Sequence, residues 1–326
     1  MTINTQKQPS IGLGLAALGR PGYINLGHAD DLSHDYAVAS MQTHAHQVLD
    51  AAWAAGVRYF DAARSYGRAE EFLGSWLQIR DIDANEVTVG SKWGYTYTAD
   101  WQIDADKHEV KEHSLAVLSR QWPESQANLS GYLKLYQIHS ATLDSGVLQN
   151  TDVLTRLAEL KAEGMAIGLS LSGAAQAETL DSAMAVAVDG VALFDCVQAT
   201  WNILEPSAGA CLQAAHDAGL GVIVKEALAN GRLTLRNDNA DFAHKLAIVQ
   251  QQATRLETTI DALALAVVLA QPWVNVVLSG AATIEHLHTN LKAIDVVLDA
   301  EALTAVDGLA ETPAVYWSTR GQLTWN

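Results

Sequence analysis

The stretch VRYFDAARSYGRAEEFLG, residues 57 to 74, decides the fold. It begins as a short apolar run that ends on Asp61, and Tyr66 follows five residues later, just before a run with helical periodicity. A short apolar run bounded by polar residues and followed by an amphipathic run is typical of a buried strand leading into a helix. A carboxylate at the end of a buried strand is costly unless a partner neutralises it. The stretch therefore predicts a strand–helix unit and a buried partner for Asp61.

Comparable units recur along the whole chain. The expected strands are Ile11–Leu18, Val57–Asp61, Val87–Lys92, Leu133–His139, Ile167–Ser170, Cys196–Thr200, Val222–Glu226 and Val274–Leu278. The expected helices are Thr43–Ala55, Ala69–Gln78, Lys107–Gln121, Thr151–Glu163, Ala174–Val188, Ser207–Ala218, Thr258–Ala270 and Ile284–Leu298. Eight strands alternating with eight helices in 326 residues favour an α/β fold of parallel strands, a single-domain (β/α)8 TIM barrel over residues 1–326.

An open, doubly wound sheet is the competing architecture. It calls for a GxGxxG phosphate loop at the first strand–helix turn, whereas residues Gly12 to Gly19 read GLGLAALG and are not followed at once by a helix. The first-strand glycines therefore indicate close packing at the mouth of a barrel.

Composition limits the partners that the chain can have. Lys and Arg number 20 against 37 Asp and Glu, a net charge of −17, which argues against nucleic acid as a partner. The longest apolar run, Ala262–Ala270, is too short to cross a membrane, and the polar first residues do not resemble a signal peptide. Cys196 and Cys211 cannot form a disulfide framework or a closed zinc site. We expect a soluble, cytoplasmic protein without a metal site.

Three consecutive strands of the expected barrel end on residues that carry chemistry. The contexts YFDAARSYG, VGSKWGY and YQIHS place Asp61 and Tyr66, Lys92, and His139 at these ends. Each residue alone has a structural explanation, such as a cap, a half-buried aromatic ring or a histidine bonded to backbone. In a barrel, however, the carboxyl ends of the strands surround one site, so we expect these four side chains to converge there.

The same residues resemble the aldo-keto reductase family, and the resemblance extends from Ile11 to about Ile294. Asp61, Tyr66, Lys92 and His139 match the four catalytic residues of that family in order. The resemblance implies a (β/α)8 barrel that transfers hydride between NADP or NAD and a small carbonyl or sugar substrate.

A carbonyl that accepts hydride needs a proton donor, and we expect Tyr66 to be that donor. The ammonium group of Lys92 is expected to lower the pKa of the Tyr66 phenol, while Asp61 holds Lys92. His139 is expected to orient the carbonyl group.

The resemblance also implies where the nicotinamide binds. Ser170 and Gln198 match residues that bind its amide group, whereas Leu171 stands where the family has an asparagine. Trp93 and Trp201 are expected to line the substrate pocket; ordinary barrel packing is the alternative for Trp201.

The seventh strand departs from the family pattern. The run VKEALANGRL places Lys225 and Glu226 where many relatives have an aromatic residue and a serine. Ala227, Leu228 and Arg232 follow in the loop expected near the pyrophosphate. Lys225 either affects the nicotinamide ring or holds a pyrophosphate oxygen. Glu226 is expected not to neutralise it, because neighbours on a strand point to opposite faces.

The eighth strand leads into SGAATIEHLHTN, which resembles the segment that wraps the adenosine. No arginine or lysine stands where NADP-preferring relatives carry one, so the sequence indicates NAD, or NADP with little discrimination. The positions expected to contact the cofactor here are Ser279, Gly280, Ala282, Thr283, His286 and Asn290.

The aromatic tail Tyr316 to Asn326 is expected to lie near the barrel mouth, with the closed bottom of the barrel as the alternative. The resulting interpretation is an NAD(P)-dependent aldo-keto reductase, or an alcohol or aldose dehydrogenase. The alternative is a non-enzymatic barrel that binds nicotinamide as the redox-sensing subunit of a partner complex. The sequence leaves the physiological substrate, the preferred direction and the oligomeric state open.

Overall fold

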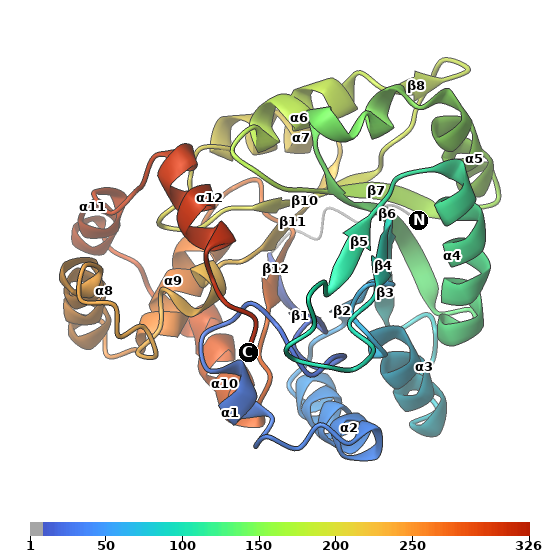
Figure 1. Cartoon of the computed structure of the whole chain (residues 1–326). Helices are drawn as coiled ribbons and strands as arrows, with labels where there is room; N and C mark the ends of the chain where they lie inside the picture. Colours follow the sequence, from blue (N-terminus) through green and yellow to red (C-terminus); the bar gives the residue numbers. More distant parts are fainter. Residues whose placement is uncertain (1–8) are drawn as a thin grey trace.

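A computed structural model describes residues 9–326, in which eight parallel strands close into one barrel (Figure 1). All eight strands expected from the sequence are present, with ends shifted by a few residues, so the (β/α)8 fold is confirmed. Around the barrel they are β1 (Ser10–Gly14), β2 (Tyr59–Asp61), β3 (Thr88–Trp93), β6 (Leu133–Ala141), β7 (Ala166–Leu171), β10 (Cys196–Thr200), β11 (Gly221–Lys225) and β12 (Val276–Ser279), which pairs with β1.

Helices surround the barrel and cover the outward faces of its strands (Figure 1). The residues that fill the interior are mainly apolar and form a buried cluster of Tyr59, Leu135, Ala166, Cys196, Ile223, Val276 and Leu278. The helices are α1 (His28–Asp31), α2 (Val38–Ala54), α3 (Ala69–Ile79), α4 (Leu115–Leu129), α5 (Thr151–Ala162), α6 (Gln176–Met184), α7 (Gly209–Asp217), α8 (Ala243–Arg255), α9 (Ile260–Leu269), α10 (Ile284–Leu291), α11 (Ala300–Asp307) and α12 (Pro313–Gly321).

One expected helix was wrong over its first half. Residues Glu109–Lys111 form strand β5, which pairs with β4 (Tyr95–Tyr97) in an antiparallel hairpin. Helix α4 begins only after Ser114, whose hydroxyl accepts a hydrogen bond from the backbone N–H of Val117 at 3.2 Å. The sequence missed this boundary because so short a strand has no periodicity of its own.

The remaining differences lie mainly in the second half of the chain. Helix α10 ends at Leu291 instead of continuing to Leu298. A second short hairpin is formed by β8 (Ala187–Val188) and β9 (Val191–Ala192). Helices α1, α8, α11 and α12 were not expected. Short 3₁₀ turns are η1 (Leu143–Ser145), η2 (Val147–Gln149), η3 (Ala229–Gly231) and η4 (Lys292–Asp295).

The segment after α12 returns to the open end of the barrel (Figure 1). There the backbone N–H groups of Tyr23 and Asn326 each donate to the other residue's carbonyl, at 3.1 and 3.2 Å. This pairing holds the chain beyond α12 against the loop that follows β1.

No helix in the part of the chain described, residues 9–326, combines the length and the apolar character needed to cross a membrane.

Candidate active site

The carboxyl ends of the barrel strands surround a cavity of about 710 Å³. Its walls come from the ends of β1, β2, β6, β10, β11 and β12, from the β4–β5 hairpin and from the segment after α12. A cavity of this size at this end of a barrel is the position in which barrel enzymes hold their ligands.

Asp61 and Lys92 form a buried ion pair beneath this cavity. Their side chains are 2% and 0% exposed, and Lys92 Nζ donates to Oδ1 of Asp61 and, at 3.0 Å, to the backbone carbonyl of Ala62. Lys92 Nζ also donates to the phenolic oxygen of Tyr66 at 3.5 Å. The expected partner of Asp61 is therefore Lys92, and both groups lie beside Tyr66.

Close backbone packing fixes the loop that carries Tyr66. A Cβ atom on Gly19 would lie 2.3 Å from the carbonyl oxygen of Tyr66, so only glycine fits there. Gly67 has a φ of +57°, and its Cβ would lie 2.4 Å from the carbonyl oxygen of Gly19. The loops after β1 and β2 are thus in direct backbone contact, which positions the phenol.

The structure corrects the expected effect on Tyr66. Its pKa is raised, first by burial and next by the charge of Asp61, although Arg20 acts in the opposite direction. Lys92 lies beside the phenol and favours its ionised form, but burial and the charge of Asp61 outweigh this effect. Tyr66 is therefore protonated at neutral pH and can act as a proton donor.

His139 lies next to Tyr66, with ring centroids 5.4 Å apart and nearly perpendicular planes. Burial, followed by the charges of Lys92, Arg20 and Lys225, holds the pKa of His139 well below its usual value. The imidazole is therefore neutral and can donate one hydrogen bond without adding charge.

The two expected nicotinamide-binding residues have other partners. Gln198 lines the cavity, but its amide nitrogen donates to Oδ2 of Asp61 at 2.9 Å. Ser170 is 1% exposed, and its hydroxyl accepts from the backbone N–H of Ser140 at 2.8 Å. Ser170 therefore shapes the end of β6, and the neighbouring Ser172 lines the cavity instead.

Neither tryptophan expected in the substrate pocket faces the cavity. Trp93 is completely buried and packs edge-on against His113, with ring centroids 5.7 Å apart. Trp201 packs against Trp273, and its Nε1 donates to the carbonyl of Pro206 at 3.1 Å. Neither ring is among the residues that line the cavity, so neither is placed to contact a substrate there.

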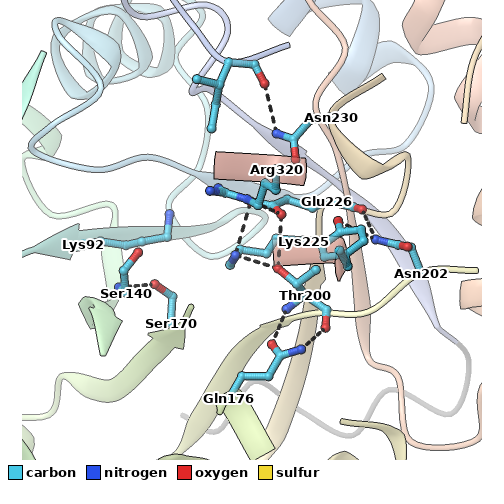
Figure 2. A network of polar contacts seen from close by, with 12 residues as sticks. Lys92, Ser140, Ser170, Gln176, Thr200, Asn202, Lys225, Glu226, Asn230 and Arg320 are labelled. Carbon is cyan, nitrogen blue, oxygen red and sulfur yellow. Dashed lines mark hydrogen bonds and ion pairs between the residues drawn. The ribbon is translucent and has the colours of Figure 1, made fainter. Parts of the chain in front are cut away.

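The end of β11 corrects a further expectation (Figure 2). Glu226 has a φ of +58°, which breaks the alternation of the strand and brings its carboxylate to 3.4 Å from the ammonium of Lys225. Arg320 of α12 donates to the same carboxylate through Nε, at 3.0 and 2.9 Å, and through Nη2 at 2.5 Å. We call Lys225, Glu226 and Arg320 the charge cluster.

The loop after β11 contributes to the cavity in part. Ala227 and Leu228 line it. Arg232 does not, because its guanidinium forms two hydrogen bonds to the buried carboxylate of Glu311, at 3.0 and 2.7 Å. Arg236, one turn further on, lines the cavity in its place.

The segment after β12 also divides into two groups. Ser279, Gly280, His286 and Asn290 line the cavity, and Asn290 Nδ2 donates to the hydroxyl of Ser279 at 2.9 Å. Ala282 and Thr283 do not line the cavity. Ala282 is 1% exposed, and the hydroxyl of Thr283 caps α10 by accepting from the N–H of His286 at 3.2 Å.

Sequence reasoning missed several charged residues of the cavity. Near Tyr66, Arg20 is 2.8 Å from the carboxylate of Glu109, and its guanidinium lies 4.7 Å from the ring centroid of Trp325. At the far end, Arg236 binds both carboxylate oxygens of Asp31, at 2.9 and 2.5 Å. These pairs join residues far apart in the sequence, so no local sequence pattern predicts them.

Among residues 9–326, no three His, Cys, Asp or Glu side chains are grouped so that they could hold a metal ion.

Comparison with known proteins agrees with this geometry. The family described as "Aldo/keto reductase family" matches residues 10–311. Aldo-keto reductase str7 of Strobilurus tenacellus is 27% identical, covering 92% of this chain and 87% of that protein. The uncharacterized oxidoreductase YqkF of Bacillus subtilis is 26% identical over 76% of this chain and 80% of its own length.

A solved structure has the same architecture. The aldo-keto reductase AKR11C1 from Bacillus halodurans, in its holo form, superposes with a TM-score of 0.70 at 20% identity. The match covers 93% of this chain and 92% of that chain. At this identity the likeness shows a shared fold.

Proposed function

Because this chain belongs to the aldo/keto reductase family, we propose that it is an NAD(P)-dependent oxidoreductase in which Tyr66 is the proton donor to a small carbonyl substrate. The observation that supports this most directly is the contact of Tyr66 with the buried Lys92–Asp61 pair at the edge of the cavity. The neutral imidazole of His139 also lies beside Tyr66, with ring centroids 5.4 Å apart.

The cavity fits a dinucleotide cofactor. It runs from Tyr66 and His139 to the residues before and within α10, and its volume falls within the usual range of cofactor sites. Backbone near Gly280 is open, since a Cβ atom there would meet nothing within 4 Å. Asn290 and Ser279 offer neutral polar groups, and the Arg236–Asp31 ion pair lies at the same end.

When bound, a reduced nicotinamide supplies the hydride that the carbonyl carbon accepts. Tyr66 Oη gives its proton to the carbonyl oxygen, and His139 donates a hydrogen bond to that oxygen. Lys92 Nζ, 3.5 Å from Tyr66 Oη, stabilises the phenolate that remains after the transfer. Asp61 holds Lys92 in place and offsets the cost of burying its charge.

We further propose that the substrate is an aldehyde, a ketone or an aldose, since each presents a carbonyl group that Tyr66 and His139 can bind. The wall beside Tyr66 combines aromatic rings with the Arg20–Glu109 ion pair. A relative that is 22% identical over 82% of this chain is named norsolorinic acid reductase, in Aspergillus flavus.

For the cofactor we propose NAD, or NADP with little discrimination. The far end of the cavity presents the carboxylates of Asp261 and Glu285 together with Arg236 and His286. Arg236 is already bound to Asp31 by two hydrogen bonds. A 2′-phosphate therefore meets a cation that is already neutralised, as well as two like charges.

The test is turnover of a panel of aldehydes, ketones and aldoses with each cofactor, in wild type and in Tyr66→Phe. The variant keeps the ring but loses the proton, so kcat should fall about 10²–10⁴-fold. Cofactor affinity, measured by fluorescence quenching, should change little. Turnover by Tyr66→Phe at the wild-type rate would refute the assignment, and cofactor binding without any turnover by wild type would favour the redox-sensing alternative.

A further inference from the structure

The charge cluster at the end of β11 has no role in the proton transfer described above. Lys225 Nζ donates to the hydroxyl of Thr200 at 2.8 Å, and that hydroxyl is 3.3 Å from Oε2 of Glu226 (Figure 2). The side chains of Lys225, Glu226 and Arg320 are 16%, 8% and 23% exposed. The three charged side chains are therefore largely buried and held in fixed positions in the cavity wall.

The cluster carries one positive charge in excess. Burial works against ionisation of Glu226, but Arg320 and Lys225 together lower the pKa of the carboxyl group to about 2. Burial lowers the pKa of Lys225 to about 8, which still leaves the ammonium mostly protonated at neutral pH. Two cations therefore face one carboxylate.

The other charges near Tyr66 cancel in pairs. Lys92 is paired with Asp61, and Arg20 with Glu109. The excess charge at the reactive end of the cavity therefore comes from the charge cluster. Because the three side chains are largely buried, the excess charge is screened less than it would be at a surface.

The field of the cluster extends to the site of hydride transfer. Lys225 lines the same cavity as Tyr66 and His139, and its charge is among those that depress the pKa of His139 after burial, Lys92 and Arg20. A nicotinamide ring that exchanges hydride with a carbonyl held by Tyr66 must lie beside these residues. The oxidised ring carries a positive charge, whereas the reduced ring is neutral.

We propose that the charge cluster makes the cavity discriminate between the two redox forms of the cofactor, binding the reduced form more tightly than the oxidised form. This inference rests on the proposed function. Its consequence is that the bound cofactor is a stronger hydride acceptor than the free cofactor, since tighter binding of the reduced form favours its formation on the protein. The arrangement suits oxidation of an alcohol or of an aldose.

The structure also assigns a reason for the contact between α12 and the barrel. Without Arg320, Glu226 would neutralise Lys225 and the excess charge would vanish. The segment that carries Arg320 thus sets the charge of the cavity from 94 residues away in the sequence.

The experiment measures dissociation constants of the oxidised and reduced cofactor by fluorescence titration at pH 7. Wild type should bind the reduced form more tightly. Lys225→Met and Arg320→Met each remove one positive charge, and each should reduce the ratio of oxidised to reduced dissociation constants by about tenfold, the effect of ~1.4 kcal/mol. Glu226→Gln removes the negative charge and should raise the ratio.

Glu226→Gln should change the ratio of dissociation constants in the direction opposite to Lys225→Met and Arg320→Met. General damage to the site would not change the ratio in two directions, so this comparison isolates the electrostatic effect. Lys245→Met is the matched control. Lys245 is paired with Glu311 and does not line the cavity, so this variant should leave the ratio unchanged. Circular dichroism and thermal unfolding establish that each variant is folded.

An equal loss of affinity for both forms in Lys225→Met would overturn the proposal and assign Lys225 to a cofactor phosphate. Equal affinities of wild type for the two forms, or a ratio that no variant changes, would also overturn it. Failure of wild type to bind either form would instead refute the proposed function.

Discussion

The side-chain amide of Gln198 donates to Oδ2 of Asp61 at 2.9 Å and so links β10 to β2 across the inside of the barrel. The hydroxyl of Tyr59 donates to the same oxygen at 3.2 Å, while Oδ1 receives the ammonium of Lys92. Asp61 therefore has separate donors for its two oxygens. Both carboxylate oxygens are held without a hydrogen bond from Tyr66, which leaves the phenol free to take part in proton transfer.

We expect variants of the Asp61–Lys92 pair to change stability and activity independently. Asp61→Asn leaves a buried ammonium without its counter-ion, which should cost about 3–5 kcal/mol of unfolding free energy. Lys92→Met should lower kcat about 10²-fold or more, because the phenolate of Tyr66 loses its stabilising charge. The double variant removes both charges, so it should regain much of the stability but none of the activity. Denaturant unfolding and kcat measurements test this, and a double variant with the wild-type kcat would contradict the roles given to these residues.

Cofactor preference should respond to Asp31. Asp31→Asn releases Arg236 from its ion pair and removes a negative charge, so NADP should bind about tenfold more tightly relative to NAD, a change of ~1.4 kcal/mol. Asp30→Asn is the control, since the side chain of this exposed neighbour is bonded, within residues 9–326, only to His34. Titration with both cofactors decides the matter. If the preference is the same in both variants and wild type, Arg236 does not lie near the 2′ position.

Stability should fall on acidification because of buried neutral histidines. The pKa of His113 is lowered to about 4 by burial, and Lys111 adds to this effect, whereas an unfolded histidine titrates near 6.5. The unfolded state therefore binds more protons between pH 6.5 and 4, so the free energy of unfolding falls as pH decreases through this window. The contribution is about 3 kcal/mol in full.

His113→Gln should make the decline with pH shallower. In the folded protein Nε2 of His113 donates to the carbonyl of His139 at 2.8 Å, and Nδ1 is buried without a partner in the part of the chain described. An added proton at Nδ1 would therefore be unpaired. His28 is also buried, which lowers its pKa to about 4. The double variant His28→Gln/His113→Gln should therefore show a still weaker dependence of the free energy of unfolding on pH. Denaturant unfolding at several pH values measures the slope, and equal slopes in wild type and both variants would count against this explanation.

Gly19→Ala should impair both folding and catalysis. The added methyl group would lie 2.3 Å from the carbonyl oxygen of Tyr66 and 2.7 Å from the backbone nitrogen of Ala69, so the two loops must separate. We expect a loss of about 1–3 kcal/mol in stability and a reduced kcat. In Gly308→Ala the nearest atom is 3.9 Å away, and this control should be neutral or slightly stabilising. Wild-type kcat in Gly19→Ala would show that the position of Tyr66 does not depend on this contact.

Part of the site could be predicted because its candidate catalytic side chains lie at or near the ends of strands. Asp61, Lys92 and His139 each terminate or closely follow an apolar run, and Tyr66 follows five residues after one of them. In a closed parallel barrel all such ends meet at one rim, so local patterns were enough to place these side chains together.

Other predictions failed where the direction of a side chain depends on the backbone or on packing. Arg232 and Arg236 lie in one loop, yet Glu311 holds the first away from the cavity and the second lines it. Trp93 follows Lys92 directly but points to the other side of its strand, as alternation requires. Glu226 escapes that alternation only because its φ is positive, which no pattern of polar and apolar residues reveals.

The sequence by itself thus determined the parallel barrel and the group formed by Asp61, Tyr66, Lys92 and His139, because the periodicity of apolar residues and the ends of strands are local properties. Only the tertiary structure decided the electrostatics of the cavity. Arg20 meets Glu109 and Arg320 meets Glu226 across 89 and 94 residues of chain. Whether such charges cancel depends on distances of a few ångströms in a poorly screened interior, and these distances exist only once the chain has folded.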